Sequence, residues 1–517
     1  MSDAKARTVS RRGALGLFGA TAVAAPLLGT ATAEAATPAF VPSVGNGATP
    51  VQGLHLQFGA DPSRQMVVSW ITESSVRKPR VVYGTLEGGF GGCADADTKT
   101  YVDGTSGRTV YIHHAELTRL RPNTQYMYAA QHDGATPDAG TFRTAPSGRM
   151  PFTFTSFGDQ SAPQVTWAAN GAVGLDANST PATKDIVTGI ETVAPLFHLL
   201  NGDLCYANLD VDRVRTWNNF FTNNTRSARF RPWMPAAGNH EIEKQNGPIG
   251  LAAYQAYFDL PSTETDPELQ GLWYGFTAGS VRVIVLQNDD NCLQDGGDVY
   301  VNGYSGGRQL KWLEKELAAA RRSRDIDWIV VAMHQVMIST SDANGADLGL
   351  RQLYGPLFDK YGVDLVLCGH EHDYERSLAV HGVVSGSETL TPNPVSSATD
   401  NIDATHGTVH MILGGGGVSG TTNGSFFKDG TGKVITAVSA TPGANGKRTS
   451  TYVKEEAVWS AVRDLDHPYG FAAFTVDPGR SPGDTTTMHV TYYNVNKPHG
   501  DLAVFEQFSL HRKRSDG

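Results

Sequence analysis

The sequence predicts two folded domains, an all-β sandwich and then a larger α/β domain in which two β-sheet layers are flanked by helices. The chain has 517 residues, which is more than one hydrophobic core usually supports. Residues from about 50 to 146 alternate between short apolar runs and polar or Gly/Pro turns, as antiparallel strands do. From residue 150 the apolar runs become continuous, as in strands covered on both faces, and helical segments lie between them.

The chain begins with a targeting segment, predicted for residues 1–36. Arg11 and Arg12 precede an apolar run and then small residues that suit signal cleavage. This pattern resembles the signal read by the bacterial twin-arginine export route. The alternative is a membrane anchor, but the run is short, rich in glycine and broken by Pro26. We expect a protein that is exported from a bacterium and secreted, with no membrane attachment once the signal is removed.

The all-β domain is predicted for residues 48–146. Its expected strands are LHLQFG, MVVSWIT, RVVYG, VYIHHAEL, QYMYAAQH and GTFRTA. The segment LTRLRPNTQYMY, a turn followed by tyrosine, resembles the corner of a fibronectin type III sandwich. We expect this domain to pack against the second domain or to shape the rim of its site. The alternative is a simple spacer.

The second domain is predicted for residues 150–512, including C-terminal strands. Its expected strands are FTFTS, LFHLLN, VRVIVLQ, DWIVVAMH, VDLVLCG, HGTVHMILGGGG, YGFAAFTVD and TMHVTYYNV. One helix is expected in GGRQLKWLEKELAAARRS, where Leu310, Leu313 and Leu317 share a side, and a second in LGLRQLYGPLFDKYG. Residues 378–405 and 418–460 are polar and rich in Gly, Ser and Thr, which predicts long loops.

Charge and cysteine content exclude some classes of protein. The net charge of −10 argues against a protein that coats nucleic acid, although it permits phosphate substrates if metal ions supply positive charge. Four scattered cysteines are too few for a disulfide scaffold. Cys205 and Cys368 end apolar runs and are expected to pack as small hydrophobes. Cys93 and Cys292 could pair outside the cell, and the sequence leaves this open.

Metal-binding residue types recur where the apolar runs end. They are Asp159 in GDQ, Asp203 and Tyr206 in GDLCY, Asn239 and His240 in GNHE, His334 in MH, and His370 and His372 in GHEH. Loops at the carboxyl ends of parallel strands converge on one site. Each motif alone is weak, because aspartate is common in turns. In GHEH the two histidines lie two positions apart, so they would share one face of a regular strand, and a turn after the glycine lets both face one cavity.

This set of residues has a chemical logic. Two carboxylates, an amide oxygen, three imidazoles and a phenolate are enough for two metal ions that share one bridging carboxylate. Two such ions can clamp the attacking and leaving oxygens of a phosphoryl transfer and acidify a bound water. Carboxylate and phenolate oxygens favour a hard trivalent ion, whereas amide and imidazole groups suit a divalent one.

The order GDQ, GDLCY, GNHE, MH and GHEHDYER resembles the purple acid phosphatases, a branch of the dinuclear metallophosphoesterases, over nearly all of the mature chain. The tyrosine three positions after Asp203 is the feature that selects this branch. The resemblance implies a metallophosphoesterase-like fold for the second domain and an Fe(III) plus Zn, Mn or Fe(II) centre. The implied ferric ligands are Asp159, Tyr206, His372 and the bridging Asp203, and those of the second metal are Asp203, Asn239, His334 and His370.

The resemblance also implies that Asn239 and His240 face the substrate, and that His240 contacts the phosphate and protonates the leaving group. The alternative for His240 is a hydrogen-bonding role behind the ligands. Glu241 is expected to orient its loop, and Asp373, Tyr374 and Glu375 to support the centre. Members of the family usually carry a further substrate-facing histidine after the MH motif, and none lies between His334 and His370. Asn344 or Arg351 could take that place.

We therefore expect a secreted acid phosphatase that hydrolyses small phosphomonoesters through metal-bound hydroxide, fastest at mildly acidic pH. One alternative is a phosphodiesterase or nucleotidase on the same dinuclear scaffold. Another is a non-catalytic protein that binds cell wall or carbohydrate through its all-β domain. The sequence leaves the natural substrate, the second metal and the oligomeric state open.

Overall fold

The computed structural model describes residues 48–162, 178–294, 297–419, 426–444, 446–495 and 502–517, with the backbone of two short paired strands, β10 (Val165–Trp167) and β11 (Val173–Leu175). These residues belong to one unit. The targeting segment predicted for residues 1–36 lies outside them, and the predicted bounds of the domains stay predictions. Within the described residues, no helix is both long and apolar enough to cross a membrane.

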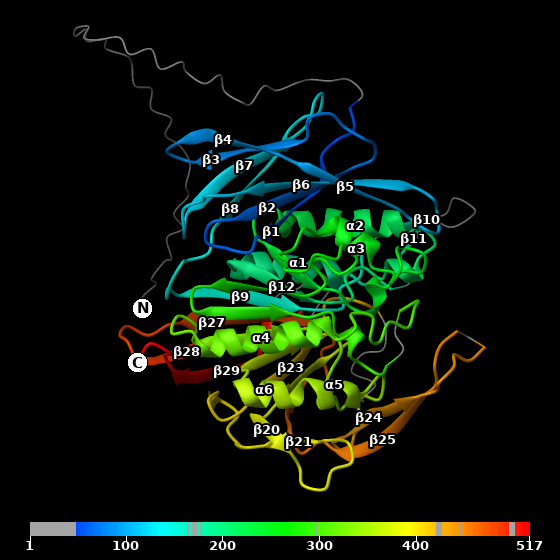
Figure 1. Cartoon of the computed structure of the whole chain (residues 1–517), viewed down its shortest axis with the longest axis vertical. Coiled ribbons are helices and arrows are strands. Elements are labelled where there is room, and N and C mark those ends of the chain that lie inside the picture. Colours follow the sequence, from blue (N-terminus) through cyan, green and yellow to red (C-terminus); the bar gives the residue numbers. More distant parts are fainter. Residues whose placement is uncertain are drawn as a thin grey trace, which may run out of the picture. The chain divides into compact units, whose positions relative to one another are not determined.

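The N-terminal part is the expected all-β domain, built from two four-stranded antiparallel sheets (Figure 1). The first has the order β1 (Gln52–Phe58), β2 (Met66–Thr72), β6 (Thr109–Leu117), β5 (Asp97–Val102). The second has the order β4 (Gly89–Asp95), β3 (Arg80–Thr85), β7 (Gln125–Gln131), β8 (Asp138–Arg143). Strands β4 and β5 were not predicted, because their residues are mostly polar or glycine. The backbone N–H of Arg121 donates to the Tyr126 hydroxyl at 2.9 Å, a tyrosine-corner contact.

The second domain contains two seven-stranded sheets, as the α/β prediction requires. The first has the order β13 (Trp233–Ala236), β12 (Phe197–Asn201), β9 (Phe152–Phe157), β27 (Gly470–Asp477), β28 (Thr485–Val495), β29 (Leu502–Lys513), β22 (Asn401–Asp403). The second has the order β14 (Tyr274–Ala278), β15 (Val281–Val285), β16 (Trp328–Ala332), β18 (Leu365–Cys368), β23 (Val409–Leu413), β19 (Tyr374–Ser377), β26 (Ser460–Arg463). Every strand predicted in this domain is present.

Each large sheet has a parallel part, and this part positions the site. Strands β9, β12 and β13 run parallel in the first sheet, and β15, β16, β18 and β23 run parallel in the second. These strands are buried along their whole length or nearly so, which explains their continuous apolar runs. Their carboxyl ends precede the segments that the sequence singled out.

Helices cover the sheets on both sides (Figure 1). They are α1 (Ala182–Val193), α2 (Arg213–Ala228), α3 (Ala252–Tyr257), α4 (Arg308–Arg322), α5 (Leu348–Leu353) and α6 (Gly355–Tyr361), with short 3-10 turns η1 (Ala207–Leu209), η2 (Asn239–Glu241) and η3 (Asn288–Asp290). The expected α4 buries Leu313 and Leu317 and packs against β16. The prediction of one continuous helix in LGLRQLYGPLFDKYG is wrong. The segment divides into α5 and α6, and Pro356 lies in the first turn of α6, where it needs no N–H partner.

The two predicted loops are also partly wrong, because they contain strands. Residues 378–405 include β20 (Val380–Val383), β21 (Pro392–Pro394) and β22. Residues 418–460 include β24 (Thr431–Val438) and β25 (Ser450–Glu456), an antiparallel hairpin that pairs with β17 (Ala346–Asp347). The polar composition concealed these strands, since most of β25 faces solvent.

The N-terminal sandwich packs directly against the second domain. Phe58 of β1 lies 5.7 Å, between ring centroids, from both Phe197 and Phe276 of the large sheets. Tyr128 donates its hydroxyl to the backbone oxygen of Arg229 at 2.8 Å. The expected packing is therefore present, and the two domains share a continuous hydrophobic core.

All four cysteines are free thiols. Cys93 is exposed and Cys292 is buried, so the disulfide left open for this pair is not formed. Cys205 and Cys368 are buried in the core, as their positions at the ends of apolar runs predict.

Candidate metal centre

The structure brings the predicted ligand residues together where the parallel strands end. Asp159 follows β9, Asp203 and Tyr206 follow β12, Asn239 lies in η2 after β13, His334 follows β16, and His370 and His372 follow β18. All of them are buried except His372, which is partly exposed. Strand β13 was too short to recognise in the sequence, but its loop delivers Asn239 to the same place.

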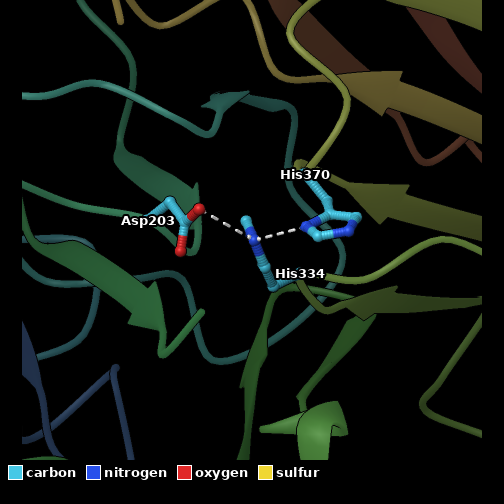
Figure 2. Close-up of side chains that lie close together, drawn as sticks. All are labelled: Asp203, His334 and His370. Carbon is cyan, nitrogen blue, oxygen red and sulfur yellow. Dashed lines mark hydrogen bonds and ion pairs between the residues drawn. The ribbon is translucent and has the colours of Figure 1, made fainter. Parts of the chain in front are cut away.

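Four donor atoms form a first group. The Nε2 atom of His334 lies 3.2 Å from Asp203 Oδ2, 3.0 Å from Asn239 Oδ1 and 3.2 Å from His370 Nδ1. The Nδ1 atom of His370 is also 3.1 Å from Asn239 Oδ1. Figure 2 shows Asp203, His334 and His370 turned toward one another. One carboxylate oxygen, one amide oxygen and two ring nitrogens thus converge.

In His334 and His370, the hydrogen bond of the outer ring nitrogen determines whether the nitrogen in the donor group carries a proton. The Nδ1 atom of His334 is 2.8 Å from the backbone oxygen of Asn201, so it carries a proton and donates it. The Nε2 atom of His370 donates in the same way to Gln294 Oε1 at 2.7 Å. In the neutral rings, Nε2 of His334 and Nδ1 of His370 therefore present lone pairs to oxygen lone pairs. A metal cation can accept all of these lone pairs, so the four donor residues fit a metal site.

Three donor atoms form a second group beside the first. The hydroxyl of Tyr206 lies 3.2 Å from Asp159 Oδ1 and 3.1 Å from His372 Nε2, and this nitrogen is 3.4 Å from Asp159 Oδ1. Burial, followed by the charge of Asp159, raises the pKa of Tyr206 well above its ordinary value. A phenolate in this place therefore requires a cation beside it. Carboxylate, phenol and imidazole form a second set that fits a metal.

The charges on the first group also favour a cation. Burial opposes ionisation of Asp203, but the charge of His334 outweighs it and lowers the pKa of this carboxyl. Burial likewise lowers the pKa of His334, and the charge of Asp203 outweighs that and raises the pKa to about 10. Burial and the charge of His334 together lower the pKa of His370 well below its ordinary value. Without metal the group therefore holds one extra proton on His334, which metal binding must release.

Backbone conformation aims the donors. Asp159, Asp203, Tyr206 and His370 have φ values of 59°, 50°, 58° and 73°, in the left-handed region that residues with a Cβ rarely adopt. Such strain costs roughly 1–3 kcal/mol per residue and collects at functional sites. At His370 it provides the turn that lets both histidines of GHEH line one cavity.

Two glycines allow the loops to approach closely. A Cβ at Gly202 would meet His334 Nδ1 at 2.5 Å, and a Cβ at Gly369 would meet Asp159 Oδ2 at 2.3 Å. Both distances are well inside van der Waals contact. The glycine that precedes Asp203 and the one that precedes His370 are therefore required by packing.

Glu241 holds two of the loops together, in agreement with its predicted role. Its Oε2 atom accepts backbone N–H hydrogen bonds from Asp203 at 2.9 Å and Gly238 at 2.7 Å. Its Oε1 atom accepts a third from Leu204 at 2.8 Å. Both oxygens thus accept backbone N–H groups, and the Glu241 side chain is fully buried.

His240 lies beside the donor groups and is partly exposed. Its Nδ1 atom is 2.9 Å from Asn208 Oδ1, and its ring packs on that of Tyr206 at 4.5 Å between centroids. Its Nε2 atom lies 4.0 Å from Asp203 Oδ2. Because Asn208 holds the Nδ1 proton, Nε2 is the nitrogen that can exchange a proton with a ligand.

A cavity of about 310 Å³ is lined by six of these residues, namely Asp203, Tyr206, Asn239, His240, His370 and His372. Asn344 lines it, so one of the two residues suggested for the missing histidine is at the site. Arg351 does not, because it is buried and ion-paired with Glu455 at 2.6 Å. The sequence missed Gln294, Asn208 and Lys447, which no motif marks. No residue of the N-terminal domain is among the described residues that line the cavity.

Two protein families match the chain. The family described as "Purple acid Phosphatase, N-terminal domain" matches residues 51–144, and the family described as "Calcineurin-like phosphoesterase" matches residues 178–374. The second match contains every predicted ligand except Asp159.

Known proteins extend this similarity. The chain is 57% identical over 470 residues to an uncharacterized protein of Mycobacterium tuberculosis (strain H37Rv), covering 91% of this chain and 88% of that one. It is 28% identical over 378 residues to Fe(3+)-Zn(2+) purple acid phosphatase 12 of Arabidopsis thaliana, covering 71% and 72%. The fold resembles that of purple acid phosphatase PPD1 from yellow lupin, with a TM-score of 0.66, 21% identity, and 90% of this chain and 75% of that one covered.

The fold, the two donor groups and the phosphoesterase match define a metallophosphoesterase, an enzyme that hydrolyses phosphate esters at a dinuclear metal centre. The N-terminal match and the plant relatives narrow this class. The chain belongs to the purple acid phosphatase family.

Proposed function

We propose that this protein is a phosphatase that removes phosphate from small monoesters. The observation that carries the proposal is the position of His240 beside two converging donor groups, with Asn208 fixing its tautomer. When bound, two metal ions supply the positive charge that activates water and stabilises the phosphoryl oxygens. The Nε2 atom of His240 then holds a proton at the cavity floor and delivers it to the departing alcohol oxygen.

Comparing monoester with diester hydrolysis tests this proposal. We expect the metal-loaded protein to hydrolyse 4-nitrophenyl phosphate with a higher kcat/KM than bis(4-nitrophenyl) phosphate. A faster diester reaction would favour the phosphodiesterase alternative. A proton donor matters most for a poor leaving group. His240→Asn should therefore lower kcat by about 10²–10⁴-fold for phenyl phosphate and less for 4-nitrophenyl phosphate. Equal losses for both esters would remove His240 from the proton-donor role.

We also propose the identities of the metals and their ligands. Asp159, Tyr206 and His372, with Asp203 shared, would hold Fe(III), since carboxylate and phenolate oxygens suit a hard ion. Asn239, His334 and His370, with Asp203, would hold Zn, Mn or Fe(II). The name of the Arabidopsis relative, an Fe(3+)-Zn(2+) enzyme, supports an iron and zinc pair.

Metal analysis and visible spectroscopy test this assignment together. The oxidised protein should contain two metal ions and show a tyrosinate-to-iron absorption band. Tyr206→Phe should remove the band while the metal in the other group remains. Two bound metals with no such band would exclude Fe(III) beside Tyr206, and the assignment to the metallophosphoesterases would stand.

Secretion is proposed from the sequence around Arg11 and Arg12. Replacing both arginines with lysine should keep the full-length protein inside a bacterial host that carries the twin-arginine route. Export of this variant at the rate of the unchanged chain would contradict the proposal.

A further inference from the structure

The cavity above the donor groups has a buried floor and an exposed mouth. Five of the donor residues line its floor (Asp203, Tyr206, Asn239, His370 and His372), whereas Leu209 and Lys447 are the lining residues that are exposed. Lys447 is also the only lysine or arginine among the described residues that line the cavity. The cavity has a volume of about 310 Å³, which reaches the range of small-molecule sites. A substrate bound at the floor can therefore extend to the Lys447 ammonium group.

Described residues beside Lys447 make several contacts, although the Lys447 side chain is exposed. Lys447 lies at the tip of the β24–β25 hairpin, where its carbonyl accepts the N–H of Gly443 at 2.8 Å. The guanidinium of the adjacent Arg448 lies 4.2 Å from the centre of the Tyr300 ring, and it donates to the backbone oxygen of Ser439 at 2.9 Å. These contacts help to position Lys447, which lines the cavity.

From this placement we infer that Lys447 selects phosphomonoesters that carry a second anionic group, a carboxylate or a second phosphate, away from the reacting phosphorus. The inference rests on the proposed phosphatase function. The reacting phosphate lies against the buried donors, so a cation at the mouth meets the far end of the substrate. An uncharged leaving group gains nothing from it, whereas an anionic one gains an ion pair.

Substrate preference tests the inference. Three aryl phosphates are compared: phenyl phosphate, 4-carboxyphenyl phosphate and benzene-1,4-bisphosphate, the last of which has two equivalent phosphoryl groups. We define the preference as kcat/KM per phosphoryl group for each ester with a second anionic group, divided by that for phenyl phosphate. The preference should exceed one, fall about threefold to fivefold in Lys447→Gln, as for an exposed ion pair, and be retained in Lys447→Arg. The carboxylate and bisphosphate arms show which anion is favoured. High salt should weaken the preference in the unchanged protein.

A matched control is available on the same hairpin. Lys454 in β25 pairs with Asp429 at 2.9 Å and does not line the cavity, so Lys454→Gln should keep the preference of the unchanged protein. If the preference falls equally in Lys447→Gln and Lys454→Gln, the effect comes from the net charge of the protein and not from Lys447 in the cavity. A preference of one in the unchanged protein, or an equal loss for all three substrates in Lys447→Gln, would also overturn the inference.

A binding measurement separates this inference from the proposed function. Calorimetry on the metal-loaded full chain compares phenylphosphonate with 4-carboxyphenylphosphonate, which cannot be hydrolysed. Tighter binding of the carboxylated ligand that is lost in Lys447→Gln supports the inference even if no monoester is hydrolysed, and in that case only the phosphatase proposal fails. Equal binding of both ligands to the unchanged protein overturns the inference.

Discussion

At the scale of single residues, Gln294 decides which nitrogen of His370 can face a metal. It accepts the Nε2 proton of His370 at 2.7 Å and donates to Asn344 Oδ1 at 3.2 Å. Replacing Gln294 with Leu removes the acceptor, so His370 can protonate Nδ1 instead. We expect affinity for the metal at this group to fall about 10–100-fold, measured by competition with a chelator. Gln294→Glu keeps an acceptor and should lose less. Unchanged affinity in Gln294→Leu would show that the ring is oriented without it.

Glu241 acts on the backbone instead. Its two oxygens accept three N–H groups from the loops of Asp203 and Gly238. Glutamine offers only one acceptor oxygen, so Glu241→Gln leaves at least one buried N–H without a partner. This should lower the free energy of unfolding by about 1–3 kcal/mol in urea titrations of the metal-free protein. Glu456→Gln, at an exposed position of β25, is the control. Equal stabilities of the two variants would mean that Glu241 does not hold the loops.

At the scale of elements, a buried ion pair joins the base of the hairpin to α5. Arg351 donates to both oxygens of Glu455 at 2.6 and 2.8 Å, and both residues are buried. Burial raises the pKa of Glu455, but the hydrogen bond and charge of Arg351 outweigh it, so the pKa is lowered. This carboxylate therefore adds stability above its unfolded pKa, near 4.3, and the contribution disappears as the pH falls through the lower folded pKa.

Arg351→Met should thus lower the free energy of unfolding by about 3–5 kcal/mol near neutral pH, because Glu455 stays buried without its partner. In this variant burial raises the pKa of Glu455, so lowering the pH protonates the unpaired carboxylate and removes the cost of burying its charge. In the unchanged protein, lowering the pH removes the ion pair instead. The difference in stability between the two should narrow as the pH falls toward about 4. Urea unfolding across this range measures it. The control Lys360→Met breaks an exposed pair with Glu314 and should cost less than about 1 kcal/mol. A difference independent of pH would contradict this account.

The elements also explain what the sequence could predict. The proposed ligands follow strands whose long apolar runs are visible, and parallel topology brings such strand ends together, so Asp203, His334 and His370 could be grouped from the sequence alone. Gln294 follows β15, a predicted strand of the same parallel set, but its position depends on tertiary packing. Asp347 caps α5 and also accepts the backbone N–H of Gln294 at 2.9 Å, a contact between distant segments that no local pattern records.

Lys447 was concealed for a related reason. It reaches the cavity from a hairpin that the polar sequence made look like a loop, and its sequence neighbours carry no ligand. The division of one expected helix into α5 and α6 has a local cause that the sequence does contain. Pro356 starts a helix more readily than it continues one, and this outweighs the uninterrupted apolar spacing.

At the scale of the whole molecule, the shared core of the two domains determines how the protein unfolds. Phe58 of the sandwich is fully buried against Phe197 and Phe276 of the large sheets. A core that crosses the domain boundary couples the stability of the two sides, so neither should unfold alone. We expect one cooperative unfolding transition, in which intrinsic fluorescence and metal release change at the same urea concentration.

Phe58→Ala tests this coupling from the side that is remote from the metal centre. The variant opens a cavity in the shared core and should lower the free energy of unfolding by about 3–5 kcal/mol, while the transition stays single. The midpoint of metal release should move to lower urea concentration together with the midpoint of the fluorescence change, although Phe58 touches no ligand. Phe90→Ala, also in the sandwich but at a side chain 38% exposed, should shift both signals by less than about 1 kcal/mol. If Phe58→Ala instead splits the transition, with metal retained after the sandwich unfolds, the domains are independent, and the sandwich is the spacer that was the alternative to a packed domain.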